Sequence, residues 1–322
     1  MNTLRAPFPW FGGKSRVADV VWRAFGADCP NYVEPFAGSL AVLLGRPGGS
    51  GHIETVNDRD RYLANFWRAV AADPEAVARH ADWPVNEADL HARHSWLVQQ
   101  VEFRERMHTD PDFYDAKVAG WWVWGICQWI GSGWCRERET RQRQRPYLNG
   151  RDPGMGVHSR QHPHMVGNHP GTGVHRVTAG VDRFLALQRR LRRVRVACGD
   201  WTRVLGRSVV NGSDRGNPIT GGVFLDPPYA FDVRHPELYS QDDLSVGAQA
   251  RQWALEHGDH PSIRIALCGY RGEHDMPASW ACHAWKATGG YGKTDNATRE
   301  RIWFSPHCLP VDVQLKLFEV GT

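Results

Sequence analysis

The stretch YVEPFAGSL at residues 32–40 predicts a strand, a glycine turn and the start of a helix. A second predicted strand at residues 52–57 is followed by a helical pattern at residues 61–71. This order of strand, helix, strand and helix is typical of the opening of a parallel sheet that is covered by helices. We therefore predict an α/β fold from the N-terminal part of the chain.

Sheet elements return in the C-terminal part of the chain, and a helical region separates them from the first ones. Residues 73–135 look mostly helical, and residues 150–175 are rich in Gly, His and Pro, which predicts a loop. We therefore expect a Rossmann-like α/β sheet domain formed by residues 1–72 and 179–322, with residues 73–178 inserted as a mainly helical region. The further strands are expected at residues 193–198, 222–225, 263–268 and 300–304, and the further helices at residues 15–25, 181–191 and 244–257.

The composition is that of a globular protein. The chain has 322 residues, 41% hydrophobic and 23% charged, which suits one large domain or a catalytic domain with an inserted module. A formal net charge of +4 is compatible with a nucleic-acid partner but does not identify one. The 7 cysteines form no C-x-x-C pair, and there is no apolar run long enough to span a membrane. We expect no signal peptide. We therefore expect reduced thiols in a cytoplasmic protein, with most of the 15 tryptophans in the core.

A tetrapeptide whose groups could bind a ligand, Asp226-Pro227-Pro228-Tyr229, follows the apolar run of residues 222–225. Neither proline has an N–H, so the sheet ladder ends here and the carbonyl of Pro227 is left to face a ligand. A carboxylate, a carbonyl and an aromatic face then lie close together in the sequence, and a planar base with an exocyclic amine needs these three groups. Taken alone, the same residues also suit an ordinary turn after a strand.

Three further segments accompany this tetrapeptide: PFPWFGGK at residues 7–14, the strand and turn at residues 32–40, and ETVND at residues 54–58. In this order the four segments resemble the Dam-type DNA adenine N6-methyltransferases, the D12 class with the alpha arrangement of motifs. The resemblance covers both ends of the chain and is weak across residues 70–195. It implies a class I methyltransferase sheet, S-adenosylmethionine as the cofactor, double-stranded DNA as the substrate, and a target-recognition region within the insertion.

The N-terminal glycine segment is the first part of the cofactor site that the resemblance implies. Gly12 and Gly13 allow the backbone to approach a ligand closely. Lys14 would then meet the methionine carboxylate of S-adenosylmethionine, and Trp10 would cover it. Without the resemblance, a flexible turn with a solvated lysine explains this segment equally well.

The strand end within residues 32–40 is the second part of the expected cofactor site. Doubly wound folds bind nucleotide-like ligands outside the carboxyl ends of their strands, which places Glu34, Phe36 and Gly38 at the cofactor. Leu40 stands where the family often has a further glycine, so the detailed shape of this turn stays open. No G-x-G-x-x-G motif is present, which argues against NAD.

Two aspartates complete the expected cofactor site. Asp58 ends the second predicted strand, where an acidic residue would accept hydrogen bonds from both ribose hydroxyls. Asp58 could instead cap the helix that begins near Arg61. Asp200, with Trp201 beside it, follows the strand at residues 193–198 and is a candidate contact for the adenine amine of the cofactor.

The resemblance assigns the chemistry to Asp226, Pro227, Pro228 and Tyr229. The N6 amine of adenine is a poor nucleophile because its lone pair is delocalised into the ring. The Asp226 carboxylate and the Pro227 carbonyl would accept its two N–H bonds and free that lone pair for direct attack on the sulfonium methyl. A base in a duplex must be flipped out to reach such a pocket, where Tyr229 would stack on it. Neither a covalent intermediate nor a metal is required.

Single residues separate this reaction from related ones. Methylation at cytosine C5 uses a Pro-Cys nucleophile, and the sequence has no Pro-Cys dipeptide. Enzymes that methylate cytosine N4 use the same amine chemistry but more often have Ser in place of Asp226, so the aspartate favours adenine. An N4-cytosine DNA methyltransferase, an RNA adenine methyltransferase of the same fold and a catalytically silent DNA-binding protein remain as alternatives.

Arginines next to a Trp-rich stretch are the expected DNA contacts, because arginine suits phosphate contact and bidentate recognition of guanine. A second arginine cluster lies within residues 189–195, and a glycine loop at residues 289–293 would either hold the flipped base or form a hairpin turn. The His-rich loop at residues 150–175 fits no standard zinc pattern, and we expect it to order on DNA rather than to bind a metal. The expected DNA-binding residues are Arg136, Arg138, Arg141, Arg143 and Arg145.

The sequence thus predicts a site-specific DNA adenine N6-methyltransferase that uses S-adenosylmethionine. We expect double-stranded DNA as its partner, no membrane association, and a monomer or weak dimer. The recognition sequence and the existence of a restriction enzyme partner are left open.

Overall fold

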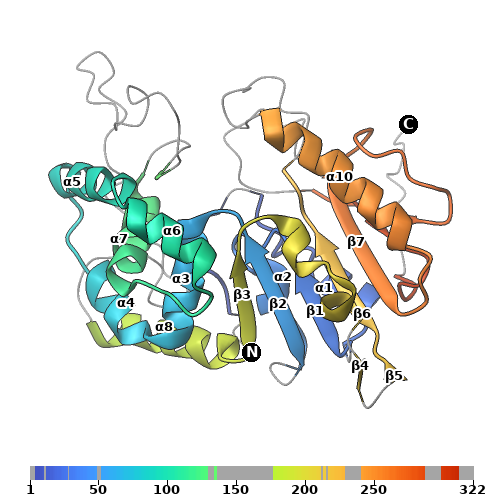
Figure 1. Ribbon diagram of the computed structural model, residues 1–322, viewed down its shortest axis with the longest axis horizontal. Helices are drawn as coiled ribbons and strands as arrows, with labels where there is room; N and C mark the ends of the chain where they lie inside the picture. Colours follow the sequence, from blue (N-terminus) through green and yellow to red (C-terminus); the bar gives the residue numbers. More distant parts are fainter. Residues whose placement is uncertain are drawn as a thin grey trace, which may run out of the picture.

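We describe the fold from a computed structural model of the chain. The described residues are 4–10, 12–27, 29–48, 52–129, 134–135, 177–211, 213–214, 217–228, 241–286 and 299–311. Helices flank a central sheet, and further helices form a lobe beside one edge of this sheet (Figure 1).

A seven-stranded sheet forms the centre of the structure. Its strands are β1 (Asn31–Glu34), β2 (Ile53–Asp58), β3 (Val194–Cys198), β6 (Gly221–Leu225), β7 (Ile263–Tyr270), β8 (Ala281–Ala284) and β9 (Glu300–Phe304). They lie in the order β3-β2-β1-β6-β7-β9-β8. The strands β3, β2, β1, β6 and β7 are parallel, whereas β9 is antiparallel to both of its neighbours, β7 and β8. The mostly parallel α/β sheet that the sequence predicts is confirmed.

The order of the parallel strands reverses at β1. The chain runs outward from β1 through β2 to β3, and then returns to add β6 on the other side of β1. Val33 of β1 is paired with Thr55 of β2 and with Val223 of β6. Such a reversal opens a crevice at the carboxyl ends of the strands, where α/β proteins bind their ligands. The fold therefore places a candidate site at the ends of β1, β2 and β6.

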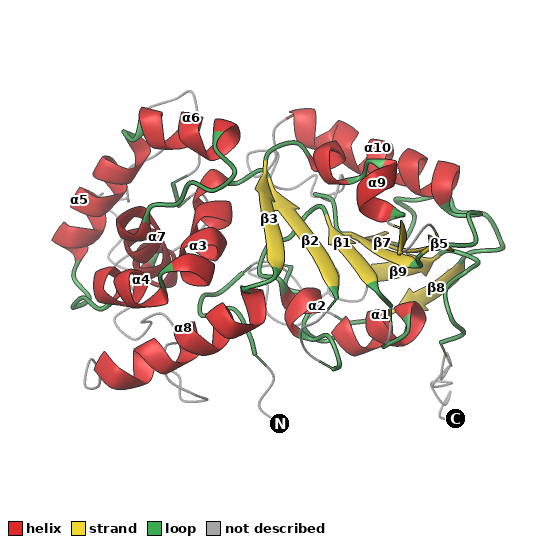
Figure 2. Cartoon of the chain, turned by 60° about the horizontal axis from the view of Figure 1, so that its bottom comes forward, coloured by secondary structure: helices red, strands yellow, loops and turns green. Residues whose placement is uncertain are grey.

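Helices cover both faces of this sheet (Figure 2). On one face lie α1 (Ala18–Phe25) and α2 (Ala41–Leu44), and on the other lie α9 (Arg207–Val210) and α10 (Gln241–His257). The smaller elements are the 3-10 helix η1 (Trp201–Val204), which follows β3, and a separate two-stranded ribbon of β4 (Ser213–Asp214) and β5 (Asn217–Pro218).

Most of the described residues between β2 and β3 are helical and form a lobe, and the helical character predicted for residues 73–135 is confirmed where these residues are described. This helical lobe comprises α3 (Arg61–Ala72), α4 (Pro74–Ala81), α5 (Glu87–Val98), α6 (Val101–Thr109), α7 (Ala116–Gln128) and α8 (Val177–Leu191). Helix α3 packs against β2 and β3 and also against α7, so it joins the lobe to the sheet. Helix α8 returns across α3 and α4 before β3 begins. The loop expected at residues 150–175 lies outside the described residues.

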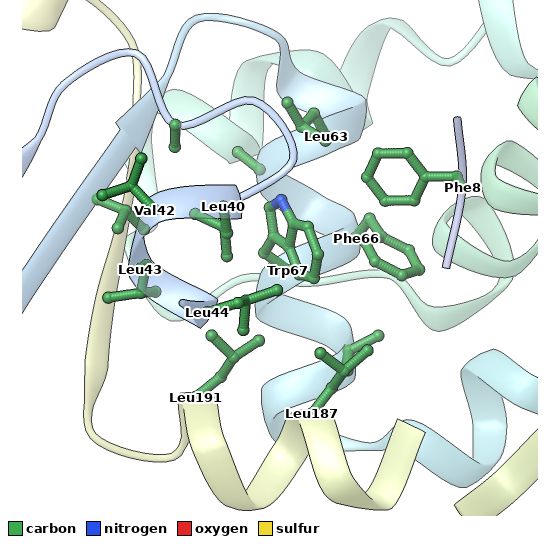
Figure 3. Close-up of a cluster of buried hydrophobic side chains, with 14 of the residues drawn as sticks. Phe8, Leu40, Val42, Leu43, Leu44, Leu63, Phe66, Trp67, Leu187 and Leu191 are labelled. Atoms are coloured by element: carbon green, nitrogen blue, oxygen red, sulfur yellow. The ribbon is translucent and has the colours of Figure 1, made fainter. Parts of the chain in front are cut away.

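One hydrophobic core runs from the sheet domain into the helical lobe (Figure 3). The ring of Phe8, from the N-terminal segment, lies 5.3 Å from the ring of Phe66, 5.6 Å from that of Trp67 and 5.2 Å from that of Trp122. Leu187 of α8 contributes to the same cluster. The helical lobe therefore shares its core with the sheet domain. As expected for the core, the buried tryptophans of this cluster are Trp22, Trp67, Trp122, Trp124 and Trp134.

A buried carboxylate fixes α8 to the sheet. Glu54 of β2 is 2% exposed, and its oxygens lie 3.0 Å from Nη1 of Arg46 and 2.6 and 2.8 Å from the two Nη atoms of Arg190. The guanidinium of Arg46 also lies over the ring of Trp22, at 4.7 Å from its centroid. Because a buried carboxylate is strongly unfavourable unless it is paired and hydrogen-bonded, this clamp defines where α8 returns to the sheet.

Leu40 departs from the usual backbone rules. Its φ of 55° and ψ of 28° place it in the left-handed region, which glycine normally occupies, and its side chain is 0% exposed. This is the position at which the resembled family often has a glycine. The turn thus keeps a left-handed backbone without a glycine, and burial of the leucine side chain offsets the resulting strain.

Replacing Leu40 by glycine should destabilise the protein no more than replacing it by alanine. Both changes remove a fully buried side chain, which costs about 2–5 kcal/mol, but only glycine relieves the positive φ, which returns about 1 kcal/mol. At Leu43, which is also 0% exposed but lies within α2, glycine should be worse than alanine by about 1 kcal/mol. Chemical denaturation of these variants measures the difference. The same order of stability at both positions would contradict the strain at Leu40.

Candidate functional site

Acidic side chains gather at the carboxyl edge of the sheet. Glu34 ends β1, Asp58 ends β2, and Asp226 directly follows β6. Asp200 follows β3 and begins the η1 helix. Because these four strands are parallel neighbours, their carboxyl ends meet along one edge, and the structure brings together the acidic residues that the sequence singled out.

Lys14 is a buried cation at this edge, and it is bound to Asp226. Its Nζ atom lies 2.9 Å from Oδ1 of Asp226 and donates a hydrogen bond to the carbonyl of Gly12 at 2.9 Å. The residue is only 4% exposed, and its ammonium lies over the ring of Trp285 at 5.8 Å. The interpretation of Lys14 as a solvated lysine in a flexible turn is therefore wrong.

The electrostatics of Lys14 reflect this ion pair. Burial on its own would lower the pKa of Lys14, but the attraction of Asp226, and of Cys268 and Glu300 more weakly, raises it above the ordinary value. The side chain is therefore charged at neutral pH.

Gly38 forms the closest backbone approach in the turn after β1. Its φ is 47°, and a Cβ atom added to it would lie 2.6 Å from Nε1 of Trp10. The indole of Trp67 donates a hydrogen bond to the carbonyl of Gly38 at 3.0 Å. The turn therefore lies between two indoles, and only glycine fits beneath Trp10.

Asp58 supports the glycine turn rather than the helix after it. Its Oδ2 accepts a hydrogen bond from the N–H of Gly38 at 2.9 Å, and its Oδ1 accepts one from the N–H of Asp60 at 2.8 Å. The cap of α3 is Asp60, whose Oδ1 accepts from the N–H groups of Tyr62 and Leu63 at 2.9 and 3.2 Å. The alternative that Asp58 caps this helix is therefore wrong. Burial and the nearby charge of Asp60 raise the pKa of Asp58 to about 6.

Asp200 lies in an exposed position and caps the short helix that follows it. Its Oδ1 accepts hydrogen bonds from the backbone N–H of Thr202, at 2.9 Å, and from the hydroxyl of the same residue. Trp201 beside it is 6% exposed and stacks on Phe36, with the ring centroids 5.5 Å apart and the planes inclined by 26°. The strand ends of β1 and β3 thus contribute one aromatic pair to the edge.

Glu34 is a buried carboxyl group with one hydroxyl partner. It is 2% exposed, and its Oε2 accepts a hydrogen bond from the hydroxyl of Tyr32 at 2.9 Å. Burial raises the pKa of Glu34 to about 8; the Tyr32 hydrogen bond opposes this rise, and the negative charge of Asp226 adds to it. Glu34 is therefore protonated in much of the folded population at neutral pH.

Two residues of the edge were not identified from the sequence. Glu300 is 5% exposed and begins β9, where it is paired with Tyr270 at the end of β7. Since β9 is antiparallel, its first residue meets the carboxyl ends of the parallel strands. Trp285, which follows β8, covers the ammonium of Lys14. The sequence predicted a strand at residues 300–304 but carried no signal of its direction.

Part of the expected site lies outside the described residues. Of the tetrapeptide, Asp226, Pro227 and Pro228 follow β6, and Pro227 is buried. The parts of the expected site that lie outside the described residues are Tyr229, the arginines Arg136, Arg138, Arg141, Arg143 and Arg145, the His-rich loop, and the glycine loop at residues 289–293.

The second arginine cluster lies away from the carboxyl edge. Arg190 is 8% exposed and belongs to the clamp on Glu54. Arg192 and Arg193 are exposed, and they precede β3, so they lie at the amino end of the sheet.

A groove with a basic balance lies beside the start of α3, which directly follows the carboxyl end of β2. It has a volume of about 390 Å³. Two arginines, a histidine and one glutamate are among the residues that line it. The lining residues are Arg61 of α3 and Val101, Arg104, Glu105, His108 and Thr109 of α6. The sequence did not reveal this set because it combines two helices.

The described residues lack two further classes of feature. This part of the chain has no group of three or more His, Cys, Asp or Glu side chains that could hold a metal ion. It also has no helix that is long and apolar enough to cross a membrane.

Residues 10–113 match the model of the D12 class N6 adenine-specific DNA methyltransferase family. This is the family that the sequence motifs resemble, and the match confirms that resemblance for the N-terminal part of the chain. It includes Trp10, Lys14, Glu34, Gly38 and Asp58 and supports DNA adenine methylation as the activity. No curated protein matches the chain.

Replacing Glu34 by glutamine should stabilise the protein in a pH-dependent way. The pKa of this carboxyl group is raised from 4.5 to about 8 in the folded protein, whereas in the unfolded chain it ionises at its ordinary value. Glu34 therefore opposes folding increasingly as the pH rises from about 4.5 to about 8, and glutamine removes this effect. We expect nearly equal melting temperatures at pH 4 and a value several degrees higher for Glu34→Gln at pH 8.

The matched control is Glu102→Gln, which alters an exposed glutamate on α6. Thermal unfolding followed by circular dichroism is the measurement. A Glu34→Gln difference that is the same at both pH values would contradict the raised pKa.

Proposed function

We propose, from the family match of residues 10–113 and from the acidic edge of the sheet, that this protein transfers a methyl group from S-adenosylmethionine to N6 of a flipped-out adenine in DNA. The observation that carries the proposal is the place of Asp226. It stands at the carboxyl end of β6, next to the point where the strand order reverses, beside Glu34 and Asp58. An acceptor for an amine and the expected cofactor contacts thus meet at one edge.

The turn after β1 is shaped by two indoles. A side chain at Gly38 would collide with Trp10, so the absence of a Cβ atom lets this indole pack on the backbone of the turn. Asp58 holds the N–H of Gly38 and is the proposed acceptor for the ribose hydroxyls. S-adenosylmethionine supplies the activated methyl group when it is bound.

The remaining cofactor contacts are proposed along the same edge. Phe36 and Trp201 offer an aromatic pair for the adenine ring, and Asp200 an acceptor for its amine. Glu34, once ionised, would favour the positive charge of the cofactor. This is the role we propose for its buried carboxyl group.

Asp226 and Pro227 are proposed to activate the target amine. A carboxylate oxygen of Asp226 and the carbonyl of Pro227 would accept the two N–H bonds of N6, which frees its lone pair for attack. Pro228 fixes the chain direction after them because its φ is locked. Tyr229 is the proposed stacking surface for the flipped base.

The fold gives further support. A mostly parallel sheet with the antiparallel β9 between β7 and β8 is consistent with a class I methyltransferase sheet. We propose residues 73–178 as the target-recognition region and Arg136, Arg138, Arg141, Arg143 and Arg145 as DNA contacts within it. The basic groove between α3 and α6 lies on the β2 side of the same edge, and we propose it as a further binding site for the phosphate backbone of DNA.

The direct test of the function is transfer of a labelled methyl group from S-adenosylmethionine to unmethylated duplex DNA, followed by mass spectrometry of the nucleosides. N6-methyladenine is the expected product. Formation of N4-methylcytosine would mean that cytosine is the target instead of adenine. Methylation of RNA alone would mean that RNA is the substrate instead of DNA. Cofactor binding without any methylated base would indicate a catalytically silent DNA-binding protein.

Replacing Asp226 by asparagine should lower kcat by at least about 100-fold and leave the affinity for S-adenosylmethionine within a few-fold of that of the unaltered protein. The amide keeps the size of the side chain but loses the charged acceptor. Alanine should also abolish transfer, but it removes the partner of Lys14 as well. Asp259→Asn, at an exposed position, is the control. Near-normal turnover of Asp226→Asn would overturn the proposed mechanism.

Neutralising the basic groove should weaken DNA binding without changing base specificity. In the double variant Arg61→Gln, Arg104→Gln, the slope of log Kd against log salt concentration should fall by about 0.9 for each lost phosphate contact. The control is the double variant Arg192→Gln, Arg193→Gln at the opposite end of the sheet, which should keep the original slope. Equal slopes for both double variants would exclude the groove as a phosphate site.

A further inference from the structure

A row of cations lies at the carboxyl edge of the sheet, on the side of the sheet away from the helical lobe (Figure 2). Arg271 directly follows β7, Lys286 follows β8 after one residue, and Arg299 directly precedes β9. Because β9 is antiparallel to β7 and β8, its beginning meets the ends of both of these strands. We call Arg271, Lys286 and Arg299 the cation row. These residues are distant in the sequence, and the sheet brings them together.

Backbone hydrogen bonds continue the sheet pairing up to the cation row. The N–H of Arg271 donates to the carbonyl of Arg299 at 2.7 Å, and the N–H of Trp285 donates to the carbonyl of Glu300 at 3.3 Å. Lys286 and Arg299 each stand one residue beyond this second pair. Since neighbouring strands lie about 4.8 Å apart, the row extends about 10 Å across the ends of β7, β9 and β8.

The charges of the cation row are available to a partner. Arg271 and Lys286 are exposed, and Arg299 is half-buried, with its guanidinium 5.4 Å from the centroid of the Tyr270 ring. Within the part of the chain that the structure describes, no ion pair joins any of the three to a carboxylate. The carboxylate of Glu273 accepts a hydrogen bond from the N–H of Tyr270 at 2.8 Å. The row therefore offers three positive charges at one edge.

We propose that the cation row binds the phosphate backbone of duplex DNA on one side of the target adenine; this inference rests on the proposed function. Asp226 follows β6, so a base that reaches it brings its duplex to the carboxyl edge. The strand order places the basic groove of Arg61 and Arg104 on the β2 side of Asp226 and the cation row on the β7 side. The two basic surfaces would then contact the duplex on opposite sides of the flipped base.

The spacing of the strands indicates which phosphates the row contacts. The strands β7, β9 and β8 lie one, two and three positions from β6, which corresponds to about 5, 10 and 14 Å. One base pair occupies about 3.4 Å of a duplex, so a duplex laid across the strands presents phosphates about one to four positions from the target. Phosphate contacts fix the place of the duplex but read no bases. The row therefore serves DNA affinity rather than the recognition sequence.

The first test measures binding without catalysis. The double variant Arg271→Gln, Lys286→Gln removes the two exposed charges, and the double variant Arg271→Lys, Lys286→Arg keeps them. The control is Arg192→Gln, Arg193→Gln at the amino end of the sheet, where both residues are exposed. Fluorescence anisotropy with a labelled duplex of mixed sequence gives Kd over a series of salt concentrations. Circular dichroism checks that each variant is folded.

We expect the slope of log Kd against log salt concentration to fall by about 0.9 for each lost contact, so by about 1.8 in the glutamine variant of the cation row. The charge-keeping variant and the control should retain the original slope. In turnover, the glutamine variant should raise KM for DNA by more than it lowers kcat. An unchanged slope overturns the inference. So does a loss of affinity for S-adenosylmethionine in place of DNA, or a lower slope on RNA alone.

The second test locates the contact along the duplex. A methylphosphonate replaces one charged phosphate by a neutral group. Placed within four positions of the methylated adenine, on the side that the row contacts, it should weaken binding several-fold in the unaltered protein. It should add little to the glutamine variant, which has already lost the contact. Equal losses in both proteins at every position would contradict the assignment.

Failure of the proposed function would look different. A protein that methylates no base would contradict that function. If the glutamine variant of such a protein still had a lower salt slope than the control, the cation row would stand as a DNA-binding surface.

Discussion

The ion pair between Lys14 and Asp226 places a positive charge among the carboxyl groups at the carboxyl edge of the sheet. Parallel strands bring their carboxyl ends to one line, so Glu34, Asp58 and Asp226 lie at the same edge of the sheet. Burial and the charges of Asp226 and Asp58 raise the pKa of Glu34 to about 8, and burial and the charge of Asp60 raise that of Asp58 to about 6. The buried ammonium of Lys14 provides the opposite charge that such an edge requires.

Where α8 returns from the helical lobe to the sheet, the charges are reversed, because two cations surround one buried carboxylate. Two guanidinium groups clamp Glu54, and one of them, that of Arg190, belongs to the helix by which the chain returns from the lobe to the sheet. The indole of Trp67 then connects the shared core to the cofactor turn, because its ring lies beside Phe8 while its Nε1 donates to the carbonyl of Gly38. A change in the packing of the lobe would therefore reach the glycine turn directly.

The sequence predicted the elements of the fold well because alternating apolar patterns report local structure. It also predicted which acidic residues meet, since parallel strands align their carboxyl ends. It could not decide between two uses of Asp58, because Asp58 and Asp60 both precede α3 and only the geometry identifies Asp60 as the cap. The partner of Lys14 and the place of Glu300 depend on contacts between distant segments, which local patterns do not report.

The residues of the edge differ in how much of their bonding is satisfied within the protein. Asp200 already caps η1, and the two oxygens of Asp58 already accept backbone N–H groups from Gly38 and Asp60. A carboxylate can accept further hydrogen bonds on each oxygen, so Asp58 can hold the turn and a ribose at once. The bond that fixes Gly38 under Trp10 therefore also orients the proposed ribose acceptor. Cofactor recognition at this edge would then depend on a carboxylate that the turn itself has pre-arranged.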